Sequence, residues 1–236
     1  MSLLKVEGLH AHYGKSHILH GVDMQIGEGA IVSLLGRNGS GRSTLLKAIM
    51  GLVPPTAGSV RLGEKELSGC RPFDVCRSGI GYVPEERLVF PNLTVDENLA
   101  MGVQKAAPGA HVWSVEEMYG YFPRLKERRG VNAGYLSGGE QQMLTICRSL
   151  LGNPRLLLID EPTEGLAPRI VDVVMEFILD IARRNVAVML VEQKLTIALK
   201  VAQDVLVMGH GELVFRGSPE ALVNAPEIRR NWLEVA

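Results

Sequence analysis

Nine residues rich in glycine, at positions 36–44, separate a short apolar segment from one with helical periodicity. Glycines allow successive backbone amides to turn toward one point, and the start of the following helix adds its positive end. This order of strand, loop and helix predicts a phosphate-binding loop in an α/β fold. The residues expected to hold the phosphates are Gly36, Arg37, Asn38, Gly39, Ser40, Gly41, Arg42, Ser43 and Thr44.

Position 42 departs from the phosphate-loop pattern, which has lysine where this chain has Arg42. Lysine carries a compact charge, whereas the guanidinium of arginine is a broad planar fork, so the exchange changes how phosphate is held. Two interpretations are open: Arg42 binds phosphate adequately with slow hydrolysis, or the site binds nucleotide and leaves turnover to a partner. Ser43 is expected to place its hydroxyl on Mg²⁺, and Thr44 to bond a phosphate.

A second anion-binding pattern lies far downstream, in the run Leu-Ser-Gly-Gly-Glu-Gln at residues 136–141. Ser137 and Glu140 have the spacing of a capping box, and the serine hydroxyl with the amides of Gly138 and Gly139 forms a phosphate site at a helix start. Two such sites on different parts of one chain cannot easily hold one nucleotide. We therefore expect a head-to-tail dimer, with each nucleotide between the loop of one subunit and the Ser-Gly-Gly of the other.

Two adjacent carboxylates follow the apolar segment 156–159. Asp160, at the carboxyl end of a strand, is suited to hold Mg²⁺ through water. Glu161 points elsewhere and is suited to polarise the attacking water as a general base. Together with the phosphate loop, this pair predicts hydrolysis of a nucleotide.

The bulk composition limits the possible classes of protein. A chain of 236 residues, 46% of them hydrophobic, fits one large α/β domain or a domain with a sizeable insertion. The net charge of −1 shows no basic excess, so no nucleic-acid partner is expected. No secretory leader is recognised, and the apolar runs 156–159 and 186–191 are too short to span a bilayer, which suits buried parallel strands.

The order of segments predicts an α/β core interrupted by helices. We expect one domain, with the core at 1–86 and 152–236 and a helical subdomain at 87–151. Strands are expected at 4–9, 22–26, 30–35, 59–62, 81–83, 155–159 and 186–191, with a hairpin of 205–208 and 212–215. Helices are expected to begin after the caps Thr94 and Ser137, near 116, at Pro168 and at Ser218. The inner face of the helix at Pro168 is expected to carry Ile170, Val173, Val174, Phe177, Ile178 and Ile181.

Three other groups of residues have simple interpretations. Cys70, Cys76 and Cys147 lack metal-ligand spacing and are interpreted as free thiols. His10, His12, His17 and His20 have no acidic or cysteine partner at a ligand spacing, so no metal is expected there. The basic residues of 124–129, interrupted by Glu127, suit either a solvated helix face or contact with a membrane subunit or lipid.

Beyond the individual motifs, the whole chain resembles the nucleotide-binding subunits of ABC transporters, whose hallmark is the Leu-Ser-Gly-Gly-Glu-Gln-Gln string at 136–142. More narrowly, six segments are similar to one of the two ATPase subunits of branched-chain amino-acid importers, a branch that includes urea and amide importers. These segments are Tyr82–Glu85, Asn98–Gly102, Phe122–Leu125, Asn153–Arg155, Gly165–Pro168 and Val191–Gln193. The resemblance implies a P-loop NTPase core with an N-terminal antiparallel β subdomain and an inserted α-helical subdomain.

The resemblance also implies roles for single residues. Tyr13 matches the aromatic that stacks on adenine, the alternative being a half-buried strand tyrosine. Glu85 stands where most of the superfamily has a glutamine that senses Mg²⁺ and the membrane subunit. Gln193 replaces the histidine that contacts the γ-phosphate, and its amide is still able to donate to phosphate. The implied catalytic residues are thus Glu161, Gln193 and Glu85, with Ser43, Asp160 and Glu85 at the metal.

The implied function is an ATP-driven motor subunit of an importer, peripheral on the cytoplasmic face of a bacterial inner membrane. Its cofactors are ATP and Mg²⁺. Its partners are a sister ATPase subunit, two transmembrane permease subunits and, indirectly, a periplasmic binding protein. The alternative is a nucleotide-binding regulatory subunit with weak or no turnover because of Arg42. A non-transport ATPase acting on DNA or ribosomes is disfavoured, because such chains carry long coiled coils or tandem nucleotide domains that do not fit in this length.

Overall fold

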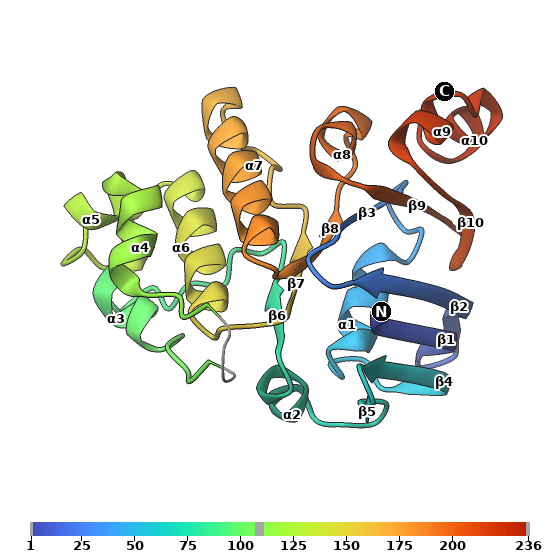
Figure 1. The fold of residues 1–236 in the computed structure, drawn as a ribbon, viewed down its shortest axis with the longest axis horizontal. Helices are drawn as coiled ribbons and strands as arrows, with labels where there is room; N and C mark the ends of the chain where they lie inside the picture. Colours follow the sequence, from blue (N-terminus) through green and yellow to red (C-terminus); the bar gives the residue numbers. More distant parts are fainter. Residues whose placement is uncertain (1, 107–110, 235–236) are drawn as a thin grey trace.

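Two sheets contain the strands of the computed structural model, which describes residues 2–106 and 111–234 (Figure 1). The antiparallel sheet has the order β2-β1-β4-β5, and the six-stranded sheet has the order β10-β9-β3-β8-β7-β6. In the second sheet the strands run parallel except β10, which pairs antiparallel with β9. This arrangement confirms the predicted α/β core with a separate N-terminal antiparallel sheet. The strands are β1 (Ser2–Tyr13), β2 (Ser16–Gly27), β3 (Ile31–Gly36), β4 (Pro55–Leu62), β5 (Lys65–Glu66), β6 (Ile80–Val83), β7 (Leu156–Asp160), β8 (Ala187–Val191), β9 (Asp204–Gly209) and β10 (Glu212–Gly217).

Helices α3 to α6 lie on one side of the parallel strands, and the antiparallel sheet lies on the other (Figure 1). Helix α1 follows the phosphate loop, and α3 to α6 all come between β6 and β7. The predicted caps Thr94 and Ser137 do begin α3 and α6. The short helices α2, α8 and α10 were not predicted. The helices are α1 (Arg42–Ile49), α2 (Pro72–Arg77), α3 (Val95–Ala100), α4 (Val115–Tyr121), α5 (Pro123–Glu127), α6 (Gly138–Leu150), α7 (Pro168–Arg183), α8 (Leu195–Val201), α9 (Pro219–Val223) and α10 (Pro226–Trp232), with a 3₁₀ turn at Ala133–Tyr135.

The first two strands are longer than their hydrophobic patterns predict. Strand β1 continues past residue 9 to Tyr13, and β2 begins at Ser16 rather than at 22. The register between them shifts at several places, one of them beside Gly8, which has φ = 53°. Such bulges break the two-residue alternation that marks a strand in a sequence. The prediction therefore ended the first strand at residue 9 and began the second only at residue 22.

Parallel strands in the middle of the second sheet alternate their side chains between two apolar cores. In β7, Leu156 and Leu158 pack toward the antiparallel sheet and α1, whereas Leu157 and Ile159 pack toward α3, α4, α6 and α7. Both faces are covered, which explains continuous apolar runs without polar alternation. The interpretation of these runs as buried parallel strands is confirmed.

One residue predicted for the inner face of α7 is misplaced. Val173 is 42% exposed, whereas Met175 is buried at 4%. Val174, Phe177, Ile178 and Ile181 are buried as predicted, and Ile170 is partly buried against the same core. Adjacent positions on a helix differ by about 100° in direction, so a residue at the border of the apolar stripe is easily assigned to the wrong side.

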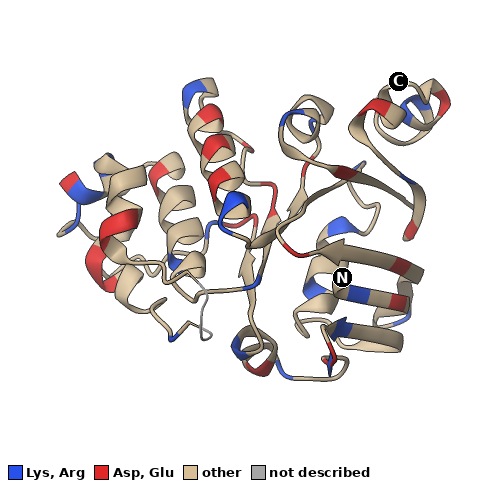
Figure 2. Ribbon diagram, in the orientation of Figure 1, with Lys and Arg blue, Asp and Glu red and all other residues tan. Residues whose placement is uncertain are grey.

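The basic residues of α5 and the following turn are all paired within the chain. Arg124 pairs with Glu127, Lys126 with Glu116, Arg128 with Glu140 and Arg129 with Asp96. Both signs of charge are interspersed over the helices of this side in Figure 2. This pairing favours the solvated helix face over a lipid-binding patch, because the positive charges are already neutralised locally.

Candidate functional site

The phosphate loop connects β3 to α1 and lines a cavity of about 330 Å³. Gly41 precedes the first turn of α1 with φ = 107°, and a Cβ there would lie 3.2 Å from the sulfur of Met208. The left-handed backbone angle favours glycine at this position, and the close packing leaves little room for a side chain. Amides of the loop and of the first turn of α1 therefore border the cavity as a cradle for an anion. The lining residues are Asn38, Gly39, Ser40, Gly41, Arg42, Ser43, Thr44, Glu85, Glu161, Glu164 and Gln193.

Most of the predicted phosphate-binding residues thus meet in one place, and two lie beside it. Gly36 and Arg37 line a neighbouring hollow with Lys194 and Leu233 instead of the main cavity. Arg37 also borders a second hollow with Trp232. The first two residues of the loop therefore face away from the main cavity, toward the C-terminal helix α10.

Arg42 lies in the interior of the site and is only 5% exposed. Its Nη2 donates to Oε1 of Glu161 at 2.8 Å and to Oδ1 of Asn38 at 3.3 Å. Its Nη1 donates to the backbone carbonyl of Glu192 at 3.0 Å. The planar fork of the arginine thus ties the phosphate loop to the ends of β7 and β8.

Asp160 ends β7 and is 1% exposed. Its Oδ1 has no hydrogen-bond partner within the described residues. Burial raises the pKa of its carboxyl and nearby Glu85 adds to that rise, whereas the neighbouring Ser43 hydroxyl and the charge of Arg42 act to lower the pKa. A buried carboxylate oxygen without a partner, beside a serine hydroxyl, fits Mg²⁺, which takes oxygen ligands.

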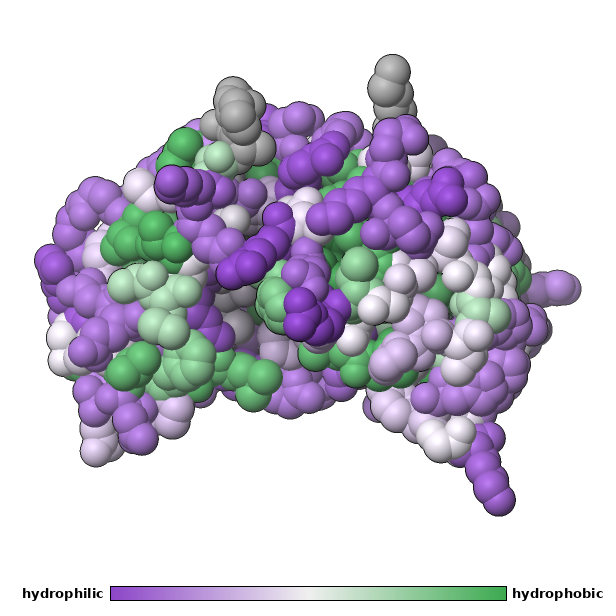
Figure 3. Space-filling model, turned by 90° about the horizontal axis from the view of Figure 1, so that it is seen from below, coloured by the Kyte–Doolittle hydropathy of each residue, from purple (hydrophilic) through white to green (hydrophobic). Residues whose placement is uncertain are grey.

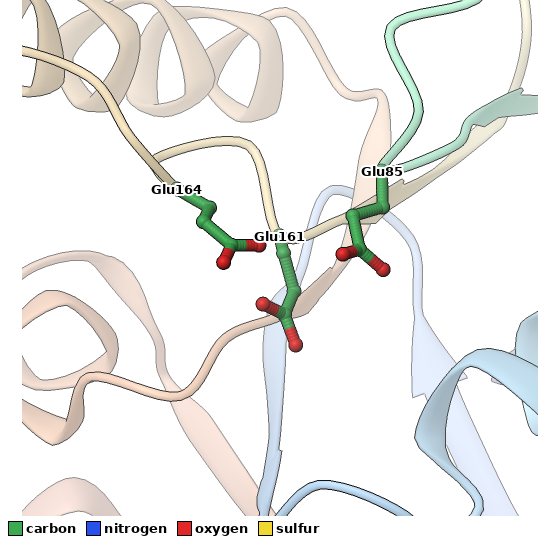
Figure 4. A group of neighbouring side chains, drawn as sticks. All are labelled: Glu85, Glu161 and Glu164. Carbon is green, nitrogen blue, oxygen red and sulfur yellow. The ribbon is translucent and has the colours of Figure 1, made fainter.

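Glu161 is the centre of a group of three carboxylates, with Glu85 after β6 and Glu164 in the loop after β7 (Figure 4). One oxygen of each lies within 4.8 Å of the others. Burial raises the pKa of Glu161, whereas Arg42 and a hydrogen bond from Gln193 lower it. Burial and the neighbouring charges of Glu161 and Glu164 raise the pKa of Glu85. Negative charge so concentrated suits a site that receives a cation together with its ligand.

Gln193 follows β8 and enters the same cavity. Its Nε2 donates to Oε2 of Glu161 at 2.6 Å. Both oxygens of Glu161 therefore have a donor, one from Arg42 and one from Gln193. This contact places the side-chain amide of Gln193 directly against the candidate general base.

Tyr13 is the predicted adenine-stacking residue, and it lies at the end of β1 with 49% exposure. It is not among the residues that line the cavity. Its exposure leaves a ring face free for a base, as stacking requires.

The histidines stack beside one another on β1 and β2 without forming a common ion site. His12 and His17 are parallel with centroids 4.1 Å apart, and Nδ1 of His10 lies 3.0 Å from Nε2 of His17. In the described part of the chain, the side chains close enough to share one ion are the three glutamates, not the histidines.

Ser137 caps α6 through a complete capping box. Its hydroxyl accepts from the amide of Glu140 at 3.4 Å, and the Glu140 carboxylate accepts from the amide of Ser137 at 2.8 Å. Burial raises the pKa of Glu140, but the bonds from Ser137 and the charge of Arg128 outweigh it and leave that pKa lowered. Ser137, Gly138, Gly139 and Glu140 are absent from the lining of the phosphate cavity. The two anion sites of one chain are thus separate.

Three residues of this region escaped the sequence analysis. Glu164 was given no role from the sequence, yet it lines the cavity. Glu192 accepts a hydrogen bond from Thr163 at 2.8 Å and is 3% exposed. Arg87 donates to the carbonyl of Glu164, and its Nη1 lies 2.3 Å from where a Cβ of Gly138 would be. A charged residue directly after a buried strand, the signal used for Asp160, would also have found Glu192.

Comparison with known proteins agrees with the geometry. The family model "ABC transporter" matches residues 19–164. The "High-affinity branched-chain amino acid transport ATP-binding protein BraG" of Pseudomonas aeruginosa is 42% identical over 231 residues, covering 98% of this chain and 99% of that protein. The "Probable branched-chain amino acid transport ATP-binding protein LivF" of Archaeoglobus fulgidus is 34% identical, covering 94% of each.

Solved structures agree as well. An ATP-binding cassette of an ABC transporter in its ADP conformation superposes with a TM-score of 0.81 at 25% identity, covering 98% of both chains. A dimeric cassette in a post-hydrolysis state, bound to ADP and Pi, gives a TM-score of 0.78 at 25% identity, covering 92% of this chain and 98% of that one. With its phosphate loop, its acidic pair at the end of β7 and its capped Ser-Gly-Gly helix, the chain belongs to the ABC transporter family as an ATP-binding subunit and ABC-type ATPase.

Proposed function

We propose that this chain is the ATP-hydrolysing motor subunit of an importer of branched-chain amino acids, working in a head-to-tail pair with a sister ATPase subunit. The observation that carries the pairing is the separation of the two anion sites, because Ser137 and its glycines do not line the cavity of their own phosphate loop. A second subunit supplies the missing half of the site. The dimeric relative bound to ADP and Pi supports such pairing.

The residues divide the chemistry among themselves. Mg²⁺, when bound, offsets charge on the phosphates, and Ser43 and Asp160 would hold it, with Glu85 near by. The loop amides and Arg42 hold the phosphates. Glu161 orients and polarises the attacking water, and Gln193 positions its carboxylate.

Permease subunits are the proposed partners, and an apolar groove of about 310 Å³ is the proposed place of contact. Phe90 is 45% and Met101 63% exposed at this groove, and Tyr82 and Arg148 also line it. Figure 3 shows apolar patches among polar ones on the side that carries α3 to α6. Among the described residues no helix is both long and apolar enough to cross a bilayer. We place the chain as a peripheral subunit on the cytoplasmic face of a bacterial inner membrane, with a periplasmic binding protein as an indirect partner.

The substrate assignment rests on the two branched-chain amino-acid relatives, since the transported molecule does not reach this subunit. Uptake of labelled leucine by cells lacking this chain tests it. Loss of leucine uptake with arginine uptake intact is expected. Equal loss of both would contradict the assignment.

The motor function is tested with Glu161→Gln protein and the sister subunit. Saturating Mg-ATP should convert the mixture to a stable pair in analytical ultracentrifugation, because the nucleotide binds and is not hydrolysed. Adding Asp160→Asn should remove the dependence of pairing on Mg²⁺. Failure of Glu161→Gln protein to pair at any nucleotide concentration would contradict the proposal.

A regulatory subunit with little turnover is the second candidate, and the buried contact between Arg42 and Glu161 favours it. ATPase rates of wild type and Arg42→Lys, each with and without the sister subunit, separate the two. A catalytic subunit turns over with either residue at position 42. Turnover that comes only from the sister subunit would identify the regulatory role.

A further inference from the structure

The ion pair between Arg42 and Glu161 joins the two groups that the reaction must keep apart. Nη2 of Arg42 lies 2.8 Å from Oε1 of Glu161, and both side chains are almost fully buried, at 5% and 7% exposure. One group binds phosphate and the other activates water. In this conformation the charge of Arg42 is neutralised by Glu161, and the charge of Glu161 is neutralised by Arg42.

We propose that Arg42 is a positioning residue that clasps Glu161 in the nucleotide-free protein and is drawn off by the phosphates when nucleotide binds. The base is then freed only in a loaded site. This inference rests on the proposed function and adds to it the order in which the groups become available.

The contacts of Arg42 favour exchange over permanent pairing. Besides Glu161, its guanidinium donates to Oδ1 of Asn38 and to the carbonyl of Glu192, so the fork is held from three sides at the wall of the cavity. An arginine fork matches phosphate as well as carboxylate, and its charge persists at all relevant pH values. Incoming phosphates therefore compete with Glu161 for the same donors.

The carboxylate of Glu161 has a second hydrogen-bond donor, which remains when Arg42 leaves. Gln193 donates to Oε2 of Glu161 at 2.6 Å, on the oxygen that Arg42 leaves free. When Arg42 departs, this bond keeps Glu161 oriented in the cavity. Glu85 and Glu164 lie on either side of Glu161, and their negative charges repel the freed carboxylate from their own positions (Figure 4).

Nucleotide must break the ion pair between Arg42 and Glu161 in order to bind, so the ion pair lowers the affinity for nucleotide. This effect gives a direct test. We would measure the affinity of the non-hydrolysable analogue AMP-PNP with Mg²⁺ by calorimetry, at protein concentrations where sedimentation shows a single chain. Glu161→Gln should bind about tenfold tighter than wild type, because an amide holds Arg42 less strongly than a carboxylate does. In an Arg42→Met background the same substitution should tighten binding by less than about threefold, since no clasp remains to be broken.

Relief of charge repulsion is the competing explanation, and Glu164→Gln is the matched control. It removes a negative charge from the same cavity, and Arg42 makes no bond to it. Its effect on affinity should be equal in both backgrounds. Equal gains from Glu161→Gln in both backgrounds would overturn the clasp.

Two further results keep the test decisive. If Arg42→Met does not fold, Arg42→Lys replaces it, and the gain from Glu161→Gln should again be smaller than with arginine. Wild-type protein that binds no AMP-PNP would overturn the proposed function itself. Binding with equal gains in the two backgrounds would overturn only the clasp.

Discussion

Glu192 is a buried carboxyl one residue before Gln193, and nothing in the proposed chemistry uses its charge. It is 3% exposed, and its carboxylate accepts from the hydroxyl of Thr163 at 2.8 Å. Burial raises the pKa of Glu192 to about 7, against the lowering effect of the Thr163 bond, and the charge of Glu161 adds to the rise. Between about pH 4.5 and about pH 7, the folded protein therefore favours a proton on Glu192 that the unfolded chain has released.

This shift predicts a pH dependence of stability. Because the folded pKa lies above the unfolded value, wild-type stability falls as pH rises from about 4.5 to about 7. Glu192→Gln removes this term, so the variant should be more stable than wild type by about 2–3 kcal/mol at pH 8 and by less than ~1 kcal/mol at pH 5. Urea denaturation at the two pH values measures it. The same difference at both would contradict the assignment.

The parts of the site that depend on local motifs were predictable from the sequence. The contacts between residues far apart in the chain were not. The loop glycines and Asp160 follow from patterns within a few residues, and the structure brings them to one cavity. The bond between Arg42 and Glu161 joins residues 119 positions apart, and no periodicity encodes such a contact. The position of Glu164 depends on the course of a loop after β7, which sequence patterns leave open.

At the scale of single elements, α6 and α4 begin with the same type of cap, but only the N-terminus of α6 belongs to the proposed nucleotide site. Ser137 and Ser114 each complete a capping box with a glutamate three residues on. Replacing either serine by alanine should lower the free energy of unfolding by about 1 kcal/mol. Only Ser137→Ala should also weaken the ATP-dependent pairing of Glu161→Gln protein, measured by sedimentation. An equal loss of pairing with Ser114→Ala would show a general effect of destabilisation.

Asn98 in α3 holds the loop before its own helix. Its side chain donates to the carbonyls of Phe90, Leu93 and Thr94 and accepts from the amide of Phe90. The three carbonyls also accept from backbone amides, those of Leu93, Ala133 and residue 98 itself. Of these groups, Asn98→Ala therefore leaves only the amide of Phe90 without a partner, and it should destabilise the protein by about 1–3 kcal/mol, measured by urea denaturation. Asn98→Asp keeps the acceptor and loses the donors, so it tests which half of the network matters. A loss below ~1 kcal/mol for Asn98→Ala would refute this role.

The starts of the capped helices were predicted well, because a cap is a local pattern. The lengths of the strands were not predicted well. The cap at Ser137 fixes where α6 begins within a window of four residues. Strand β1 extends past its alternating pattern because β2 pairs with it throughout, bulges included. Cross-strand pairing supplies that information, and a single segment does not contain it.

At the scale of the whole molecule, the apolar groove near Phe90 and Met101 is the proposed docking surface for the permease subunits. It does not share its lining with the phosphate cavity. Met101→Glu should abolish copurification with the permease subunits and leave AMP-PNP binding unchanged, because a charge in an apolar contact is costly. Val173→Glu, at an exposed site on α7, is the control and should leave both properties unchanged. Copurification of Met101→Glu at wild-type levels would exclude this groove.

The C-terminal helix gives the chain an optical property. Trp232, one of only two tryptophans, packs on Gly209 and borders the hollow that Arg37 and Ser40 also line. The other, Trp113, is buried beside α4 and bonds through its amide to Asn153. Intrinsic fluorescence of a Trp113→Phe protein would then come from a single indole next to the loop. Occupancy of the nucleotide site could be followed in real time without any attached dye.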